Sequence, residues 1–88
     1  MVPKKSIVQS ALYLKDAQLF LDECIRTHET VSITALKADG TVVNYNGWRV
    51  TSTWWRGGTV NLLNPRSGQI RKVRDVLIFM INNHPVYI

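Results

Sequence analysis

Two short segments are rich in side chains that could bind an anionic partner, one of them in aromatic and cationic residues and the other in cationic residues alone. Trp54-Trp55-Arg56-Gly57-Gly58 places two indoles beside a guanidinium, and Ile70-Arg71-Lys72-Val73-Arg74 contains three cationic side chains. Arginine carries a planar fork of N–H donors that suits phosphates and base edges, and an exposed indole offers a surface on which a base can stack. The chemistry to expect from these residue types is non-covalent recognition of an anionic partner.

The charge of the chain is concentrated in the same half as these segments. Residues 1–40 carry five basic and five acidic side chains, whereas residues 41–88 carry six basic side chains against Asp75 alone, so the net charge of +5 belongs to the second half. The six are Arg49, Arg56, Arg66, Arg71, Lys72 and Arg74. This asymmetry favours a polyanion, and in particular a nucleic acid, as the partner. The alternative is that the charge serves solubility alone.

Residues suited to catalysis are sparse. His28 and His84 have no evident acid or nucleophile partner in the sequence, and the single cysteine, Cys24, belongs to an apolar helix face. Neither a metal-spacing motif nor a phosphate-binding P-loop is present in the sequence. We therefore expect a protein that is not an enzyme and that needs no metal or cofactor.

Length and composition predict one small folded domain, residues 1–88, because 45% of its 88 residues are hydrophobic. The single cysteine excludes an internal disulfide and favours a reducing, cytoplasmic compartment. The longest apolar run, residues 76–81, is far shorter than the ~20 residues of a membrane span, and we expect no export signal at the N-terminus. A domain of this size gains stability by association, so we also expect a homo-oligomer.

The spacing of apolar residues predicts a helix over about residues 6–29. Its apolar stripe consists of Ala17, Phe20, Leu21, Cys24 and Ile25. Asp16 is a plausible N-cap, and Asp22, Glu23 and Arg26 fall on the solvent side. Residues 6–14 also alternate as a strand would, although we favour the helix.

A β-meander is predicted from about residue 31 to residue 88. The expected strands are 31–35, 42–45, 48–55, 59–63, 69–73, 77–81 and a last segment at 86–88. The expected turns are 38–40, the Asn46-Gly47 hairpin, 57–58, 64–68 and 82–85. The fold class is α+β: an N-terminal amphipathic helix packed on a small, strongly bent antiparallel β-barrel of five to six strands.

This order of elements resembles the Sm-like family, and in particular its Hfq-type bacterial RNA chaperones. The matching segments are Phe20-Leu21 in the helix, Val31-Ser32-Ile33 in the first strand, Asp39-Gly40 at the first hairpin, and Asp75-Val76-Leu77-Ile78-Phe79 at the turn into the last strand. The resemblance implies an Sm-like or SH3-like barrel and RNA as a ligand.

Strand geometry divides the candidate residues between two faces. Successive side chains alternate, so one of Trp54 and Trp55 should face the core and the other solvent. Lys72 and Arg74 share one face, with Arg71 on the other. The alternatives are that the tryptophans lie at an oligomer interface and that the strand charges protect a sheet edge from pairing.

The function predicted from these observations is nucleic-acid binding, with RNA or single-stranded DNA favoured over duplex DNA because no helix carries the basic cluster. The expected binding residues are Arg49, Trp54, Trp55, Arg56, Arg71, Lys72 and Arg74. The alternative is a non-catalytic structural or protein-interaction module that assembles through strand edges and a Trp-rich face. Neither function requires a membrane.

Overall fold

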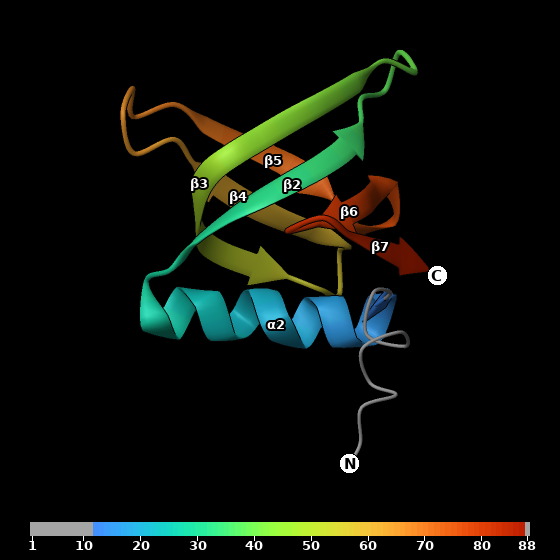
Figure 1. Ribbon diagram of the computed structural model, residues 1–88, viewed down its shortest axis with the longest axis horizontal. Helices are drawn as coiled ribbons and strands as arrows, with labels where there is room; N and C mark the ends of the chain where they lie inside the picture. Colours follow the sequence, from blue (N-terminus) through green and yellow to red (C-terminus); the bar gives the residue numbers. More distant parts are fainter. Residues whose placement is uncertain (1–11, 88) are drawn as a thin grey trace.

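A computed structural model describes residues 12–87, in which one helix packs on a strongly bent sheet (Figure 1). The elements in chain order are β1 (Leu12–Tyr13), α2 (Leu14–Thr27), β2 (Thr30–Leu36), β3 (Val42–Trp54), β4 (Thr59–Leu63), β5 (Ile70–Arg74), the 3₁₀ turn η1 (Asp75–Leu77), β6 (Ile78–Ile81) and β7 (His84–Tyr87). This arrangement confirms the α+β class.

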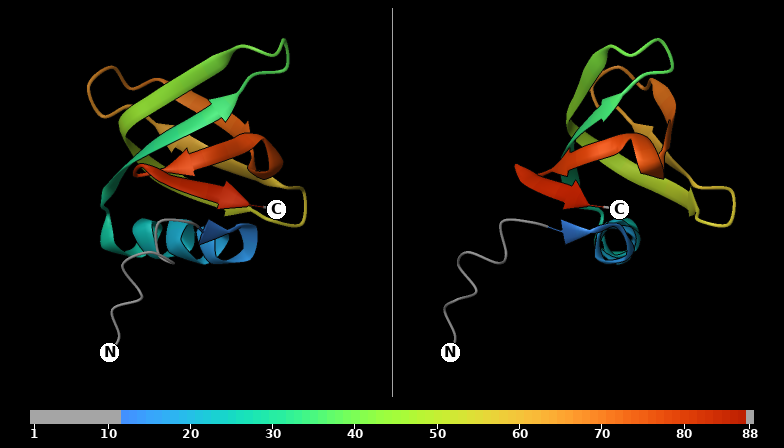
Figure 2. Two further views of the ribbon diagram at one scale, coloured as in Figure 1. Left: turned by 45° about the vertical axis from the view of Figure 1, so that its right-hand side comes forward. Right: turned by 90° about the vertical axis from the view of Figure 1, so that its right-hand side faces the viewer.

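The sheet has the strand order β1-β7-β6-β2-β3-β4-β5. All pairs are antiparallel except β1 with β7, which is parallel. The long strand β3 pairs first with β2 and then with β4, so it carries the sheet around the bend that is visible in Figure 2. Among the described residues no strand pairs with the second edge of β5. The sheet is therefore open at β5, and its closure into a barrel is not confirmed.

The helix begins later than predicted. Leu12 and Tyr13 form β1, which pairs with Val86 and Tyr87, and α2 starts at Leu14. Asp16 is not the N-cap but lies in the first turn, where its negative charge interacts favourably with the positive end of the helix dipole. Tertiary pairing with β7 overrides the helical periodicity at residues 12 and 13. The rest of the predicted early helix, residues 6–11, lies outside the described residues.

The prediction of a hairpin turn at Asn46-Gly47 was wrong. Both residues lie inside β3, where Val31 stands opposite Trp48 and Ser32 opposite Asn46. Gly47 is thus an extra residue in the ladder, and its φ of 73° is in the left-handed region that glycine tolerates. An extra left-handed glycine forms a β-bulge, which bends the strand without ending it.

The last turn is shorter than predicted. It consists of Asn82 and Asn83, with φ angles of 50° and 70°, and β7 already begins at His84. Two left-handed central residues are typical of the tight turns that join antiparallel strands. The side chain of Asn82 also accepts a hydrogen bond from the backbone N–H of Ser32 at 2.9 Å, which ties this turn to β2.

The core lies between α2 and the concave side of the sheet. Its buried hydrophobic residues are Ala17, Leu21, Cys24, Val31, Ile33, Ala35, Tyr45, Val50, Val60, Leu62, Val73, Ile78, Ile81 and Val86. Cys24 is only 2% exposed, as the helical spacing predicted. Burial is the main cause that raises the pKa of its thiol, so Cys24 has the environment of a packing residue rather than of a nucleophile.

Candidate nucleic-acid interface

The outward side of β3, β4 and β5 collects residues that are distant in the sequence. In β4, the buried Val60 and Leu62 alternate with residues that point to the opposite side of the sheet. We call these outward side chains and those registered with them the β3–β5 face. Its members are Arg49, Ser52, Trp54, Thr59, Asn61, Leu63, Ile70, Lys72 and Arg74.

The register places the predicted aromatic and cationic residues in adjoining rows of this face. Thr59 stands opposite Trp54 on one side and opposite Arg74 on the other. Since neighbouring strands lie about 4.8 Å apart, the backbones at Trp54 and Arg74 are roughly 10 Å apart. Lys72 lies in the next row, opposite Asn61. The structure therefore brings Trp54, Lys72 and Arg74 onto one face.

Trp54 is the outward member of the tryptophan pair, with 62% of its surface exposed. It begins the turn at residues 55–58, in which Gly57 N–H donates to the Trp54 carbonyl at 3.0 Å. The Trp54 ring occupies the space that a Cβ at position 57 would need, so the absent side chain of Gly57 lets the indole lie against the turn. Arg56 is exposed in the same turn.

The fit between Trp54 and Gly57 leads to a testable prediction. In Gly57→Ala, the new methyl group should displace the exposed Trp54 ring at little cost to folding, because the ring can move into solvent. We expect the Trp54 indole N–H resonance to shift and single-strand affinity to fall about threefold, a fraction of one ~1–3 kcal/mol stacking contact. In a Trp54→Ala background, the same change should have no further effect on affinity. Equal losses in both backgrounds would contradict this account.

Trp55 points the other way and holds the helix to the sheet. It packs against the core, and its indole N–H donates to the Asp22 carboxylate, with both oxygens at 3.0 Å. The Thr53 hydroxyl donates to the same carboxylate at 2.7 Å. Asp22, which was expected on the solvent side of the helix, is thus a half-buried acceptor between α2 and β3. The helical pattern alone could not reveal this partner.

Arg49 lies at the far end of the second half of β3, away from Trp54. Its Nη2 donates to Nδ1 of His28 at 2.9 Å, and its Nε is buried with no hydrogen-bond partner among the described residues. His28 caps the end of α2 in a left-handed conformation with φ 62°. Arg49 stands opposite Leu63 at the far end of the β3–β5 face, but its guanidinium is turned to the helix end and contacts His28.

The cations of β5 have no acidic partner within the described residues. The one ion pair found there joins Arg26 to Glu23 on α2. Asp75, the acidic residue that follows Arg74, is only 7% exposed and accepts a hydrogen bond from Gln18 Nε2 at 2.8 Å. Its carboxylate is thus turned to the helix, and the positive charge of Lys72 and Arg74 is left to solvent.

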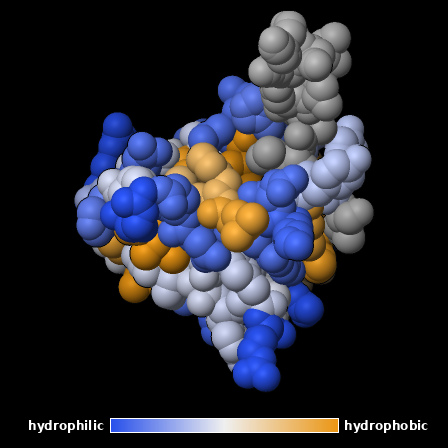
Figure 3. Space-filling view, turned by 90° about the horizontal axis from the view of Figure 1, so that it is seen from below, coloured by the Kyte–Doolittle hydropathy of each residue, from blue (hydrophilic) through white to orange (hydrophobic). Residues whose placement is uncertain are grey.

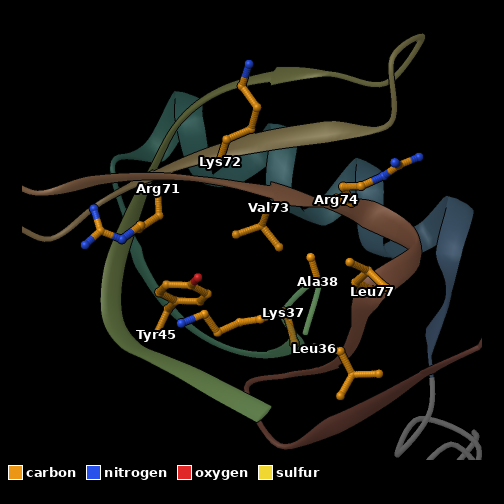
Figure 4. Close-up of a pocket in the computed structure, with 10 residues that line it drawn as sticks. Leu36, Lys37, Ala38, Tyr45, Arg71, Lys72, Val73, Arg74 and Leu77 are labelled. Atoms are coloured by element: carbon orange, nitrogen blue, oxygen red, sulfur yellow. The ribbon is translucent and has the colours of Figure 1, made fainter. Parts of the chain in front are cut away.

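Arg71 is on the opposite side of β5 from Lys72 and Arg74, as the alternation predicted. It lines a cavity beside the open edge of β5, together with Lys37 and Tyr45 (Figure 4). Sequence reasoning missed Lys37 and Tyr45 as site residues. The local sequence pattern does not identify them, because only the bend of the sheet brings the hairpin between β2 and β3 opposite β5.

Other chemistry is not evident in the described part of the chain. No group of three or more His, Cys, Asp or Glu side chains there could hold a metal ion. Within residues 12–87, no helix has the length and apolar character needed to cross a membrane. Comparison of the chain with protein-family models, curated proteins and solved structures finds no match.

Proposed function

We propose that this protein binds single-stranded nucleic acid, RNA or single-stranded DNA, through the β3–β5 face. The observation that carries the proposal is the row of Trp54, Thr59 and Arg74 across three strands, with Lys72 in the next row. An exposed indole, flanked by cations that have no acidic partner among residues 12–87, can stack on a base while the cations contact phosphates. Arg56, exposed in the adjoining turn, would extend the cationic part of the surface.

Single strands are favoured over a duplex because of where the cations lie. Duplex readers commonly insert a helix into the major groove, whereas α2 carries acidic and basic side chains together, including Asp16, Glu23 and Arg26. Figure 3 views the molecule from the α2 side and shows hydrophobic side chains interspersed with hydrophilic ones. A sheet face with an exposed aromatic residue suits unstacked bases better.

The proposal extends to the fold type. A helix followed by β2, β3, β4, β5, the 3₁₀ turn and β6 is the order of elements that suggested the Sm-like resemblance. We interpret the bent sheet as a small barrel of this Sm-like or SH3-like kind that is left open at β5. On this interpretation RNA is the first ligand to test.

Self-assembly is the second candidate, and the open edge of β5 favours it. Within residues 12–87 no strand pairs with this edge, and Ile70 and Trp54 are 61% and 62% exposed on the adjoining face. A second copy could add a strand there and cover both side chains. If so, Lys72 and Arg74 would meet acidic groups of the neighbouring subunit.

One experiment tests both candidates: chromatography with light scattering, with and without a short mixed-sequence RNA, at ~50 mM and ~500 mM salt. We expect a complex at low salt that weakens by about 0.7 in log affinity per phosphate contact for each tenfold rise in salt. No complex at ~50 mM salt would remove the nucleic-acid proposal. A mass equal to the 10.1 kDa chain without RNA would remove self-assembly.

A further inference from the structure

The open edge of β5 borders a cavity of about 310 Å³ (Figure 4). It lies between β5 and the hairpin that joins β2 to β3. Its lining residues are Ala35, Leu36, Lys37, Ala38, Tyr45, Arg71, Lys72, Val73, Arg74 and Leu77. The volume is at the lower end of the range for pockets that take one small ligand, roughly 300–1,000 Å³.

The two ends of this cavity differ in chemistry. Figure 4 shows Arg71 and Lys37 on either side of Tyr45 at one end, and the apolar Ala38 and Leu77 at the other, with Val73 between. The ring of Tyr45 is held by an edge-to-face contact with Trp48, whose centroid is 4.9 Å away. A ligand with an apolar face and an anionic group at one end would match this lining.

We propose that this cavity takes one base of the bound single strand, with the phosphate of that nucleotide held by Arg71 and Lys37. The inference rests on the proposed function and adds a second contact surface to it. The base lies against Tyr45 and the apolar wall formed by Val73, Ala38 and Leu77. The two cations lie at the same end of the cavity (Figure 4), where they can both contact the one phosphate of that nucleotide.

The position of β5 explains how one strand could use both surfaces. β5 is an edge strand of the described sheet, so nucleic acid would pass over it without crossing another described strand. Lys72 and Arg74 point away from the cavity on one side of that edge, and Arg71 lies on the other (Figure 4). A nucleic-acid strand that crosses this edge meets cationic side chains on both sides, and these can bind its phosphates while one base turns into the cavity.

An acidic peptide added to β5 as a further strand is a less suitable occupant. A strand paired with all five residues of β5 would extend about 16 Å, and alternate side chains would project to both sides of the sheet. The compact cavity instead has its cations grouped at one end. Peptide binding is nevertheless a distinct outcome that the experiment below can detect.

The test uses a variant that fills the cavity and keeps every cation. Ala38 is an exposed residue of the Lys37–Gly40 turn, so Ala38→Trp places an indole at the apolar end without disturbing the core. Val42→Trp is the matched control, because Val42 is on the same hairpin and 57% exposed but does not line the cavity. A second variant, Lys37→Ala with Arg71→Ala, removes the cations and leaves the apolar wall intact.

The first measurement is an NMR titration with uridine and adenosine monophosphates. We expect shifts at Tyr45, Val73 and Ala38 in the native protein and in Val42→Trp. We expect about tenfold weaker binding in Ala38→Trp and in the cation variant, and weaker binding of inorganic phosphate than of either nucleotide. The second measurement is the affinity of labelled single strands for the same proteins, which should fall in Ala38→Trp and not in Val42→Trp.

The outcomes separate this inference from the proposed function. Single strands that bind Ala38→Trp as tightly as the native protein, with no nucleotide shifts at the cavity, would overturn the cavity assignment and leave the β3–β5 face in place. Shifts at the cavity from an acidic hexapeptide but not from nucleotides would overturn it in favour of strand addition. Nucleotide shifts at the cavity without any single-strand binding would remove the proposed function, overturn the inference for a bound strand, and leave the cavity as a site for a free nucleotide.

Discussion

Replacing Trp54 by Ala should lower the affinity for single strands by about 5- to 150-fold and leave thermal unfolding nearly unchanged. The range corresponds to the ~1–3 kcal/mol that one base–aromatic stack contributes. Folding should tolerate the change because the side chain is 62% exposed and is not part of the core. Fluorescence anisotropy of labelled strands measures the affinity, and a thermal melt measures the stability.

Trp55 is the matched control, because replacing it should lower stability and leave the affinity of the folded protein unchanged. Trp55→Ala removes a half-buried side chain and the indole donor to Asp22, so we expect about 2–3 kcal/mol less stability, below the ~3–5 kcal/mol typical of a fully buried tryptophan. Trp55→Phe keeps the ring and loses the donor, which should cost about 1 kcal/mol. Folded Trp55→Phe should bind strands as the native protein does. If both tryptophan variants lost affinity equally, the assignment of stacking to Trp54 would be wrong.

Replacing Lys72 and Arg74 together by Ala should weaken single-strand binding by one to two orders of magnitude at ~50 mM salt. Each phosphate contact contributes about 0.7 to the log–log salt slope, so losing two should flatten that slope by roughly 1.4. Sequence preference should hardly change, because phosphate contacts carry no base information. The measurement is a set of anisotropy titrations at several salt concentrations.

The control for this prediction removes the same number of positive charges, two, from α2. Lys15→Ala with Arg26→Ala deletes two exposed cations of α2, neither of which belongs to the β3–β5 face. We expect this variant to keep both the affinity and the slope within about twofold, since salt screens exposed charges that make no direct phosphate contact. A loss equal to that of the Lys72 and Arg74 variant would mean that net charge, and not this face, determines binding.

Local patterns predicted the main elements because each has a strong signal. The 3-to-4-residue spacing of Ala17, Leu21 and Cys24 located the buried side of α2, and β4 was predicted with the bounds it has in the structure, Thr59–Leu63. Gly47 was misassigned because a left-handed glycine suits both a two-residue turn and a bulge. Only the continued pairing of β3 with β2, a non-local property, distinguishes them.

The candidate site was predictable in composition but not in arrangement. Alternation established that one tryptophan faces outward, yet register was needed to show that Trp54 shares a row with Arg74. Arg49 was grouped with the others by charge, whereas its contact with His28 places it beside the helix end. Tyr45 and Lys37 carry no local signal, because they reach Arg71 only through the bend of the sheet.

Asp75 joins the parts of the chain that carry the proposed binding residues. Its carboxylate accepts from Gln18 of α2, and its backbone N–H donates to the Gly58 carbonyl at 2.8 Å, in the turn that follows Trp54. Because Asp75 directly follows Arg74, the end of β5 and the tryptophan turn are fixed to each other before any ligand arrives. Such preorganisation would reduce the conformational entropy lost on binding, so the proposed binding of a flexible nucleic-acid strand would need few contacts.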